Sequence, residues 1–300
     1  MNRRQSLKYA AAGLLTAWAS RPLSAQQPSN GHLTDKLSVI DGDGTNVVAF
    51  SFADGFVLVD SGAPKSGDKI MAALGSNAKV RTLFNTHYHV DQTGNNEMFS
   101  AAGSKIIAHE HTRKWMSTDY WIPDEDRYEK ARPKAAWPTE TFQTTGTFKA
   151  GTEQIDYGCL PLAHTDGDIY VFFKTSNVLA VGDVASPLRD PALDYFTGAW
   201  IGGRLDAMDT ILKLSNEQTS IVPASGPVMT RAEFKAERDM MEEVRSRVWK
   251  RTLQGESPKE MLEAGVLNGL PRTWKDPFKF LYDAAKGMFA HHNKLDPSVV

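Results

Sequence analysis

The pattern that most limits how this chain can fold is a pair of histidines directly after an apolar strand. The strand is predicted over residues 80–85, and His87 and His89 follow it, with Asp91 two residues further on. In extended backbone, side chains at positions i and i+2 point to the same side, so both imidazoles face one place. Two such histidines followed by an acid predict a metal site at a strand end.

Three other predicted strand ends carry residues of related chemistry. An apolar strand ends at Asp60-Ser61-Gly62, His164 begins the segment His-Thr-Asp-Gly-Asp, and the apolar run 178–181 ends at Gly182-Asp183. The order of these motifs around His-x-His-x-Asp resembles that of the metallo-β-lactamase superfamily, including glyoxalase II. The resemblance extends over roughly residues 47–228.

The resemblance implies a first metal site made by His87, His89 and His164, with Asp183 at the edge where two metals are usually bridged. Three neutral imidazoles suit Zn²⁺, leave a fourth position for water, and lower the pKa of that water towards 7. Fe²⁺ and Mn²⁺ are the alternative metals. Asp91 is expected to orient or deprotonate the water, which makes Asp91 and Asp183 the predicted catalytic residues.

Supporting roles are expected for two further acids. The resemblance implies that Asp60 lies behind the metal ligands. Asp168 is predicted to hold the loop around His164 by hydrogen bonds.

Two departures from the family pattern fall on the second metal site. Gln92 stands where most members have a histidine after the aspartate, and Ser225 stands where they have a histidine in a Pro-Gly-His-Gly loop. The second site would then consist of Asp91, Gln92 and Ser225 beside Asp183, all oxygen donors. We expect this site to be weak, either empty or filled by a harder ion such as Mn²⁺, Mg²⁺ or Ca²⁺. The prediction is one tightly held metal per chain.

The leading functional prediction is a metal-dependent hydrolase of an ester, lactone, thioester or amide, with β-lactams among the options. One alternative is a non-haem iron oxidoreductase, because His87, His164 and Asp183 could form a two-histidine, one-carboxylate site. The persulfide dioxygenases of this superfamily use a site of that kind. A third hypothesis is a catalytically inert metal-binding protein.

The predicted elements fall into two strand-rich halves, each followed by helices. Hairpin-connected strands are expected from residue 37 onward and again over 141–181, with helices over 231–251, 258–264 and 278–289. This pattern predicts an α/β fold with a four-layer αβ/βα sandwich. We assign residues 37–230 to that domain and 231–300 to a C-terminal helical extension packed on it.

Residues 118–140 show no clear period and are predicted to be a long loop near the site, and residues 186–204 are predicted to be a second loop there. Their aromatic residues Trp121, Tyr195 and Trp200 are the predicted substrate-binding residues. His109 and His111 form a second His-x-His pair, but they stand at a helix start, where capping histidines are ordinary. A small-molecule substrate is expected, and its identity is not predicted.

Residues 1–25 resemble an export signal of the twin-arginine type, with Arg3 and Arg4 before an Ala-rich apolar run. Residues 26–36 are predicted to be a linker. Loss of the signal lowers the basic count from 34 to 30 against 36 acidic residues, so the mature chain carries a charge near -6. This balance argues against nucleic acid as a partner. The mature protein is expected to be periplasmic or extracellular, without stable membrane insertion, and its oligomeric state is not predicted.

Overall fold

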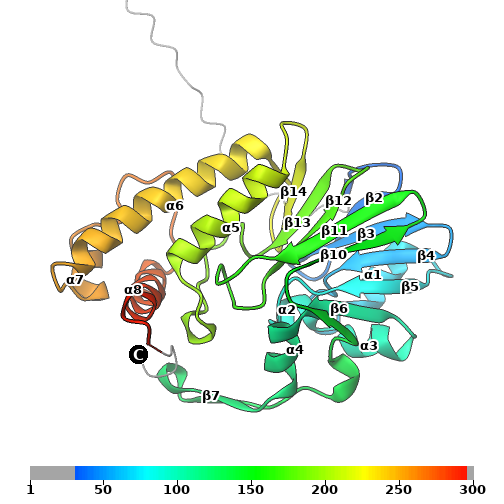
Figure 1. The fold of residues 1–300 in the computed structure, drawn as a ribbon, viewed down its shortest axis with the longest axis horizontal. Helices are drawn as coiled ribbons and strands as arrows, with labels where there is room; N and C mark the ends of the chain where they lie inside the picture. Colours follow the sequence, from blue (N-terminus) through cyan, green and yellow to red (C-terminus); the bar gives the residue numbers. More distant parts are fainter. Residues whose placement is uncertain (1–30, 296–300) are drawn as a thin grey trace, which may run out of the picture.

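The computed structural model describes residues 31–295, so the predicted export signal at 1–25 lies outside the described part. Two β-sheets pack face to face, and helices cover the outer side of each (Figure 1). No helix within residues 31–295 is long and apolar enough to cross a membrane.

The first sheet has seven strands in the order β1-β2-β3-β4-β5-β6-β9. Hairpins join β2 to β3 and β3 to β4, whereas β4, β5, β6 and β9 run parallel. The strands are β1 (Gly31–His32), β2 (Leu37–Asp41), β3 (Asn46–Phe52), β4 (Gly55–Val59), β5 (Val80–Phe84), β6 (Lys105–His109) and β9 (Glu140–Phe142).

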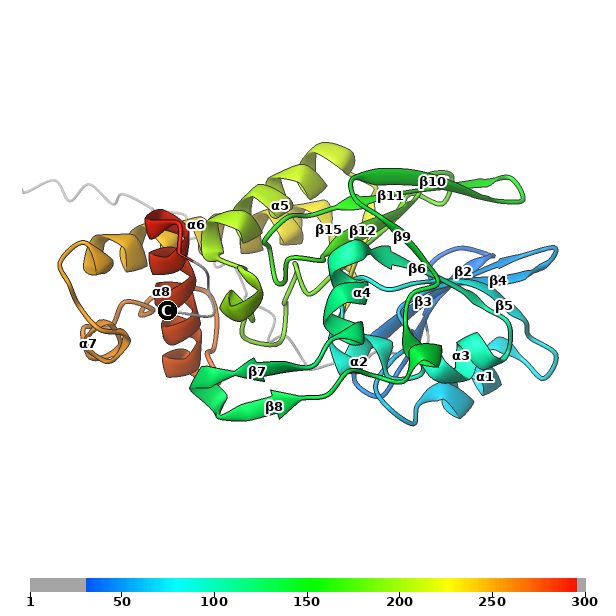
Figure 2. The same ribbon diagram turned by 60° about the horizontal axis from the view of Figure 1, so that its bottom comes forward.

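The second sheet has six strands in the order β10-β11-β12-β13-β14-β15, and only β13 and β14 are parallel. These strands are β10 (Thr145–Ala150), β11 (Glu153–Cys159), β12 (Ile169–Phe173), β13 (Val178–Gly182), β14 (Ser220–Pro223) and β15 (Met229–Thr230). A separate hairpin is formed by β7 (Tyr120–Ile122) and β8 (Arg127–Glu129). Figure 2 shows this hairpin extending from α4 towards α8.

Helices from the first half cover the first sheet, and helices from the second half cover the second. The α-helices are α1 (Gly67–Leu74), α2 (Val90–Thr93), α3 (Asn96–Ala101), α4 (Glu110–Ser117), α5 (Ile201–Leu214), α6 (Arg231–Thr252), α7 (Pro258–Glu263) and α8 (Pro277–Asn293). The short 3-10 turns are η1 (Pro123–Glu125), η2 (Lys134–Ala136) and η3 (Tyr195–Thr197).

Alternation along the strands explains the layers. In β4, Val57 and Val59 face the core between the two sheets, whereas Leu58 faces the core under α1 and α3. Period-2 alternation of buried apolar residues to both faces is what a sheet covered on both sides requires. A third core joins the outer face of β13 and β14 to α5, α6 and α8. The predicted four-layer sandwich with C-terminal helices is confirmed.

The parallel strands bring several chain segments to one edge of the sandwich. β4 and β5 run in the same direction, so Asp60 and His87 follow their carboxyl ends at the same edge. β13 and β14 are parallel in the second sheet, so Asp183 and Ser225 follow their ends in the same way. The predicted metal ligands therefore lie on loops at strand ends, supported by two rigid sheets.

Three local predictions need correction. Within the predicted linker 26–36, Gly31–His32 pair with β2, and within the predicted loop 118–140 a hairpin forms. Residues 186–204 were also predicted to be a loop, but α5 begins at Ile201. Strands of two or three residues are too short to show a period, so tertiary pairing decides them.

Candidate metal centre

Three imidazoles meet at the edge where the two sheets face each other. His87 and His89 follow β5, and His164 lies between β11 and β12. One ligand nitrogen from each lies within 4.8 Å of the others, and the described residues contain no second cluster meeting this criterion. His89 Nδ1 and His164 Nε2 are 2.9 Å apart. The structure thus brings together the three histidines predicted as metal ligands.

Each ring has an outer nitrogen with a partner of its own. The outer nitrogens contact Thr86 Oγ1 (His87 Nδ1, 3.1 Å), Ala192 O (His164 Nδ1, 2.9 Å) and Asp194 Oδ2 (His89 Nε2, 3.3 Å). His87 Nε2 is buried and has no hydrogen-bond partner among the described residues. Metal-ligating histidines are commonly oriented by a partner on the other ring nitrogen, so this arrangement fits a metal ion between the rings.

Asp183 supplies a carboxylate to the same place. Its Oδ2 lies 3.6 Å from His87 Nε2 and 3.8 Å from His164 Nε2. The preceding residue, Gly182, has φ +58°, and a Cβ there would lie 2.9 Å from Thr86. Only a glycine allows this close approach between β13 and the histidine loop. Three imidazoles with a nearby carboxylate form a donor set that suits zinc.

Burial changes the protonation of the histidines. Desolvation, with the charges of His164 and His89, lowers the pKa of His87 well below its usual value, so this ring is neutral and can bind a metal. Burial also acts to lower the pKa of His89, but the hydrogen bond and charge of Asp194 outweigh it and raise the pKa. Because a proton competes with a metal for an imidazole nitrogen, metal affinity should fall as pH falls.

Asp60 lies behind the histidines, as the sequence pattern implied. Its carboxylate accepts hydrogen bonds from Thr86 N (2.7 Å) and Thr86 Oγ1 (2.8 Å), and Thr86 Oγ1 in turn contacts His87. Burial raises the pKa of Asp60 well above its usual value, although the Thr86 donors oppose this. Asp60 has φ +65°, a strained conformation for a residue with a side chain. Strained backbone is common at functional sites, which agrees with a role for Asp60 in supporting the metal ligands.

Asp168 holds the loop that carries His164. Its Oδ2 accepts from His164 N (2.6 Å) and Thr165 N (2.8 Å), and its Oδ1 accepts from Thr165 Oγ1 (2.7 Å). All three residues are buried. Asp168 therefore positions His164 through the backbone and does not contact the ring.

Asp194 and Arg204 support the site but carry no sequence signal. Asp194 accepts hydrogen bonds from Tyr88 OH (2.5 Å) and from His89. Arg204 is fully buried on α5 and donates to Ser186 Oγ (2.9 Å) and to Ala192 O (3.4 Å), the carbonyl that also contacts His164. Asp194 acts on residues more than a hundred positions away, and both residues lie in a segment predicted only as a loop, so no local pattern could have revealed them.

Within the predicted weak second site, Asp91 has a partner from the second half of the chain. Asp91 Oδ2 lies 3.3 Å from Arg189 Nη1 and 3.4 Å from Gln92 Nε2. Ser225 is buried beyond the end of β14, next to Ala224, whose carbonyl accepts from Asn46 N. The contact with Arg189 was not predicted, because it joins residues almost a hundred positions apart.

A family model described as the metallo-β-lactamase superfamily matches residues 40–224, more than half of the chain. The chain belongs to this superfamily. Members of the superfamily share a fold, and each member's reaction depends on its own site residues. No curated protein sequence matches the chain.

Solved structures share the metallo-β-lactamase fold at low sequence identity. A metallo-β-lactamase from Pontibacter korlensis has a TM-score of 0.59 and 18% identity, over 71% of this chain and 97% of that one. A stereoselective inverting sec-alkylsulfatase from Pseudomonas sp. has a TM-score of 0.63 and 12% identity, over 87% of this chain and 49% of that one. These similarities establish the fold alone.

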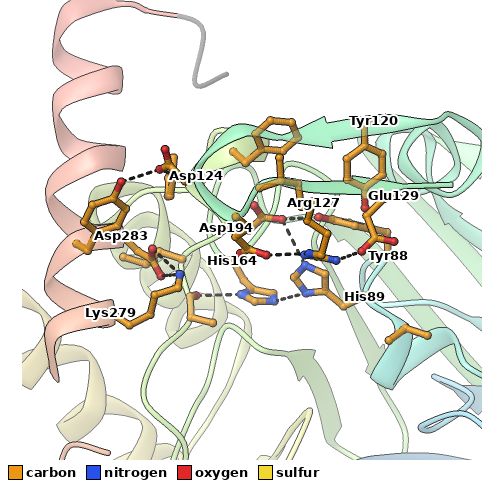
Figure 3. A pocket seen from close by; sticks show the side chains of 18 of the residues that line it. Tyr88, His89, Tyr120, Asp124, Arg127, Glu129, His164, Asp194, Lys279 and Asp283 are labelled. Carbon is orange, nitrogen blue, oxygen red and sulfur yellow. Dashed lines mark hydrogen bonds and ion pairs between the residues drawn. The ribbon is translucent and has the colours of Figure 1, made fainter. Parts of the chain in front are cut away.

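In this metallo-β-lactamase-fold protein, a cleft of about 610 Å³ opens beside His89 and His164 (Figure 3). The β7–β8 hairpin forms its roof, and α8 forms the wall furthest from the histidines. Tyr195 lines the cleft. The other two predicted substrate-binding residues do not line it: Trp121 is 45% exposed, and Trp200 stacks on His291 at 3.6 Å. Side chains alternate between the two faces of β7, so Tyr120 and Ile122 face the cleft and Trp121, which lies between them, faces away from it.

The second His-x-His pair does not join the metal centre. His109 caps α4 by accepting a hydrogen bond from His111 N, and His111 Nδ1 contacts Asp166 Oδ2 at 3.0 Å. Both histidines tie α4 to neighbouring loops. This is the capping role expected at a helix start.

Replacing His87 with alanine should lower zinc affinity on the order of 100-fold or more, because the buried nitrogen facing the other two rings is lost. Chelator competition at pH 7.5 measures this affinity, and the exposed His32→Ala variant is the matched control. Repeating the titration at pH 5.5 should weaken zinc binding in the wild type. Equal zinc affinity in the His87→Ala and wild-type proteins would contradict the assignment.

Asp168→Asn should lower the free energy of unfolding by about 2–4 kcal/mol, since the amide turns a donor towards buried N–H and O–H groups that need an acceptor. Denaturant unfolding of the metal-free proteins measures the difference. The exposed Asp35→Asn variant should stay within about 0.5 kcal/mol of wild type. If the Asp168→Asn protein is as stable as this control, the three hydrogen bonds of Asp168 do not hold the loop that carries His164.

Proposed function

We propose that this protein is an exported metal-dependent hydrolase that cleaves an ester, lactone, thioester or amide with one tightly held metal ion. The observation that carries the proposal is the convergence of three oriented imidazoles beside an open cleft, one of them with a buried nitrogen that has no hydrogen-bond partner among the described residues. Zinc suits this donor set best. Export to the periplasm or beyond is proposed from the sequence of residues 1–25 alone.

When bound, a zinc ion supplies positive charge that lowers the pKa of water and polarises a carbonyl group. Within the chain, Asp91 lines the cleft and is the candidate acceptor for the proton of the attacking water. The water oxygen bonds to the carbonyl carbon, the bond to the leaving group breaks, and the leaving group takes up the proton that Asp91 accepted from the water. Asp183 would add a carboxylate donor, and the outer partners of the histidines keep the imidazole nitrogens in place.

The cleft favours a small molecule with an apolar arm. Tyr120 and Phe196 stack with ring centroids 6.0 Å apart, and Ile122 and Phe278 add apolar surface. Most charged side chains in the lining are already paired: Arg127 lies between two glutamates, and Lys279 binds Asp283 at 2.6 Å. Burying an apolar arm here costs little desolvation of charge. β-Lactams remain one option among the carbonyl substrates.

An iron oxidoreductase is the second candidate, and one observation favours it. Asp183 lies nearly equidistant from His87 and His164, which is the arrangement of a two-histidine, one-carboxylate site. His89 Nδ1 lies 2.9 Å from His164 Nε2 and adds a third imidazole. A third imidazole favours zinc and hydrolysis, so the hydrolase is the preferred proposal.

Zinc-loaded protein should hydrolyse neutral aryl or alkyl esters, lactones or thioesters, and the His87→Ala variant should lose at least about a hundredfold in kcat/KM. A chelator should abolish turnover and added zinc should restore it. The His32→Ala variant should keep wild-type activity. Persistent turnover in the His87→Ala variant would reject the mechanism, whereas oxygen consumption by iron-loaded protein with a thiol or persulfide would favour the oxidoreductase.

Purified mature protein should retain one equivalent of metal after dialysis, since only one subsite within residues 31–295 has three imidazole donors. Elemental analysis with an accurate protein concentration measures this ratio. Two tightly held equivalents would reject the one-metal proposal. One equivalent combined with no turnover on the whole substrate panel would favour the inert metal-binding hypothesis.

A further inference from the structure

Arg189 places a fixed positive charge beside the residues predicted for a second metal. It lies in the loop between β13 and η3, and its guanidinium spans two segments of the first half of the chain. Nη1 lies 3.3 Å from Asp91 Oδ2, and Nη2 donates to Gly44 O at 3.0 Å. Arg189 therefore links the second half of the sandwich to the helix that carries Asp91 and to the turn between β2 and β3.

The backbone around Arg189 is anchored on both sides. Arg272 donates to Arg189 O at 2.5 Å and to Ser186 O at 2.7 Å. The Asp190 carboxylate accepts from Lys275 N at 2.9 Å and from Asp276 N at 2.7 Å. An exposed ion pair alone contributes little, because its side chains lose freedom when they pair. Here the backbone is already held, so the guanidinium needs less ordering to reach Asp91.

A second metal ion does not fit the site as the side chains stand. Asp91 Oδ2 already faces two N–H donors, Arg189 Nη1 and Gln92 Nε2. A metal bound to that oxygen at about 2 Å would lie close to the guanidinium, and the two positive charges would repel each other. The Gln92 amide also presents its NH₂ group, not its oxygen, towards Asp91.

Removal of Arg189 would leave a buried oxygen of Gln92 available to a cation. Gln92 Oε1 is buried and has no hydrogen-bond partner among the described residues. With Asp91 released, this oxygen and the carboxylates of Asp91 and Asp183 would be oxygen donors of the kind that hard divalent cations prefer.

We propose that the Arg189 guanidinium is a resident cation that takes the place of a second metal ion: it balances the charge of Asp91, holds that carboxylate at the cleft wall and excludes another cation. Arg189 acts as a positioning residue, through Asp91. The inference rests on the proposed function only for the first metal ion, held by the three histidines. It also explains why Asp91 is present at the site although Gln92 and Ser225 supply an amide and a hydroxyl in place of imidazoles.

The test compares metal binding by Arg189→Met, which removes the charge but keeps the length, with binding by Arg189→Lys, which keeps a charge. Arg81→Met is the matched control, because Arg81 is an exposed arginine that donates to the Asp54 carbonyl. Isothermal titration of the mature proteins, already holding one zinc, with Mn²⁺ and then with Zn²⁺ reports any second equivalent. Arg189→Gln is a second neutral variant, and thermal unfolding checks that each protein is folded.

We expect Arg189→Met and Arg189→Gln to bind a second Mn²⁺ at least tenfold more tightly than wild type. Arg189→Lys and Arg81→Met should behave as wild type. Unchanged second-metal affinity in both neutral variants would overturn the proposal, and so would tight binding of two metals by the wild type. Ester hydrolysis by the same one-zinc samples is measured separately, so an inactive protein that gains a second metal would reject the hydrolase and leave the role of Arg189 intact.

Discussion

The close approach of β5 and β13, two strands from different halves of the chain, is the contact on which the site depends. Gly182 lies against Thr86, and any side chain at position 182 would overlap it. Thr86 also accepts a hydrogen bond from Ile169 N through its carbonyl, and donates to Asp60. The residue before the first metal ligand is thereby tied to both sheets. Without this contact, His87 and Asp183 would belong to separate surfaces.

Oriented imidazoles require partners from distant segments, and the second half of the chain supplies most of them. The loop between β13 and η3 carries Ala192 and Asp194, which contact the outer nitrogens of His164 and His89. That loop is itself held by buried charged side chains from α5 and α6, Arg204 and Glu237, which both bond to Ser186. Buried polar groups of this kind are stable only when they are paired, so the helices that cover the second sheet also position the metal ligands.

The cleft beside the metal centre is built from elements added around the sandwich. The β7–β8 hairpin and α8 meet where Asp124 accepts hydrogen bonds from the hydroxyls of Tyr195 and Tyr282. Burial, with the hydrogen bond to Asp124, raises the pKa of Tyr282 to about 12. The tyrosines therefore stay neutral donors at physiological pH. Because hairpin and helix come from segments outside the strand motifs, they can change the shape of the cleft without disturbing the metal ligands.

The sequence by itself determined the sandwich and, through motifs whose order resembles that of the family, the identity of the three histidines, because strand alternation and strand-end motifs can be recognised in a single chain. The sequence around His164 also predicted the support given by Asp168, which bonds to residues three and four positions away, whereas that given by Asp60 was implied by the family resemblance. Only the tertiary structure decided the partners of Asp91, the roles of Asp194 and Arg204, and which aromatic residues line the cleft. Those contacts join residues far apart in the chain. A strand of two or three residues, or a single buried charged residue, is too short to produce a periodic pattern in the sequence. Arg189 is the clearest case: its position beside Asp91 follows from how the two halves pack.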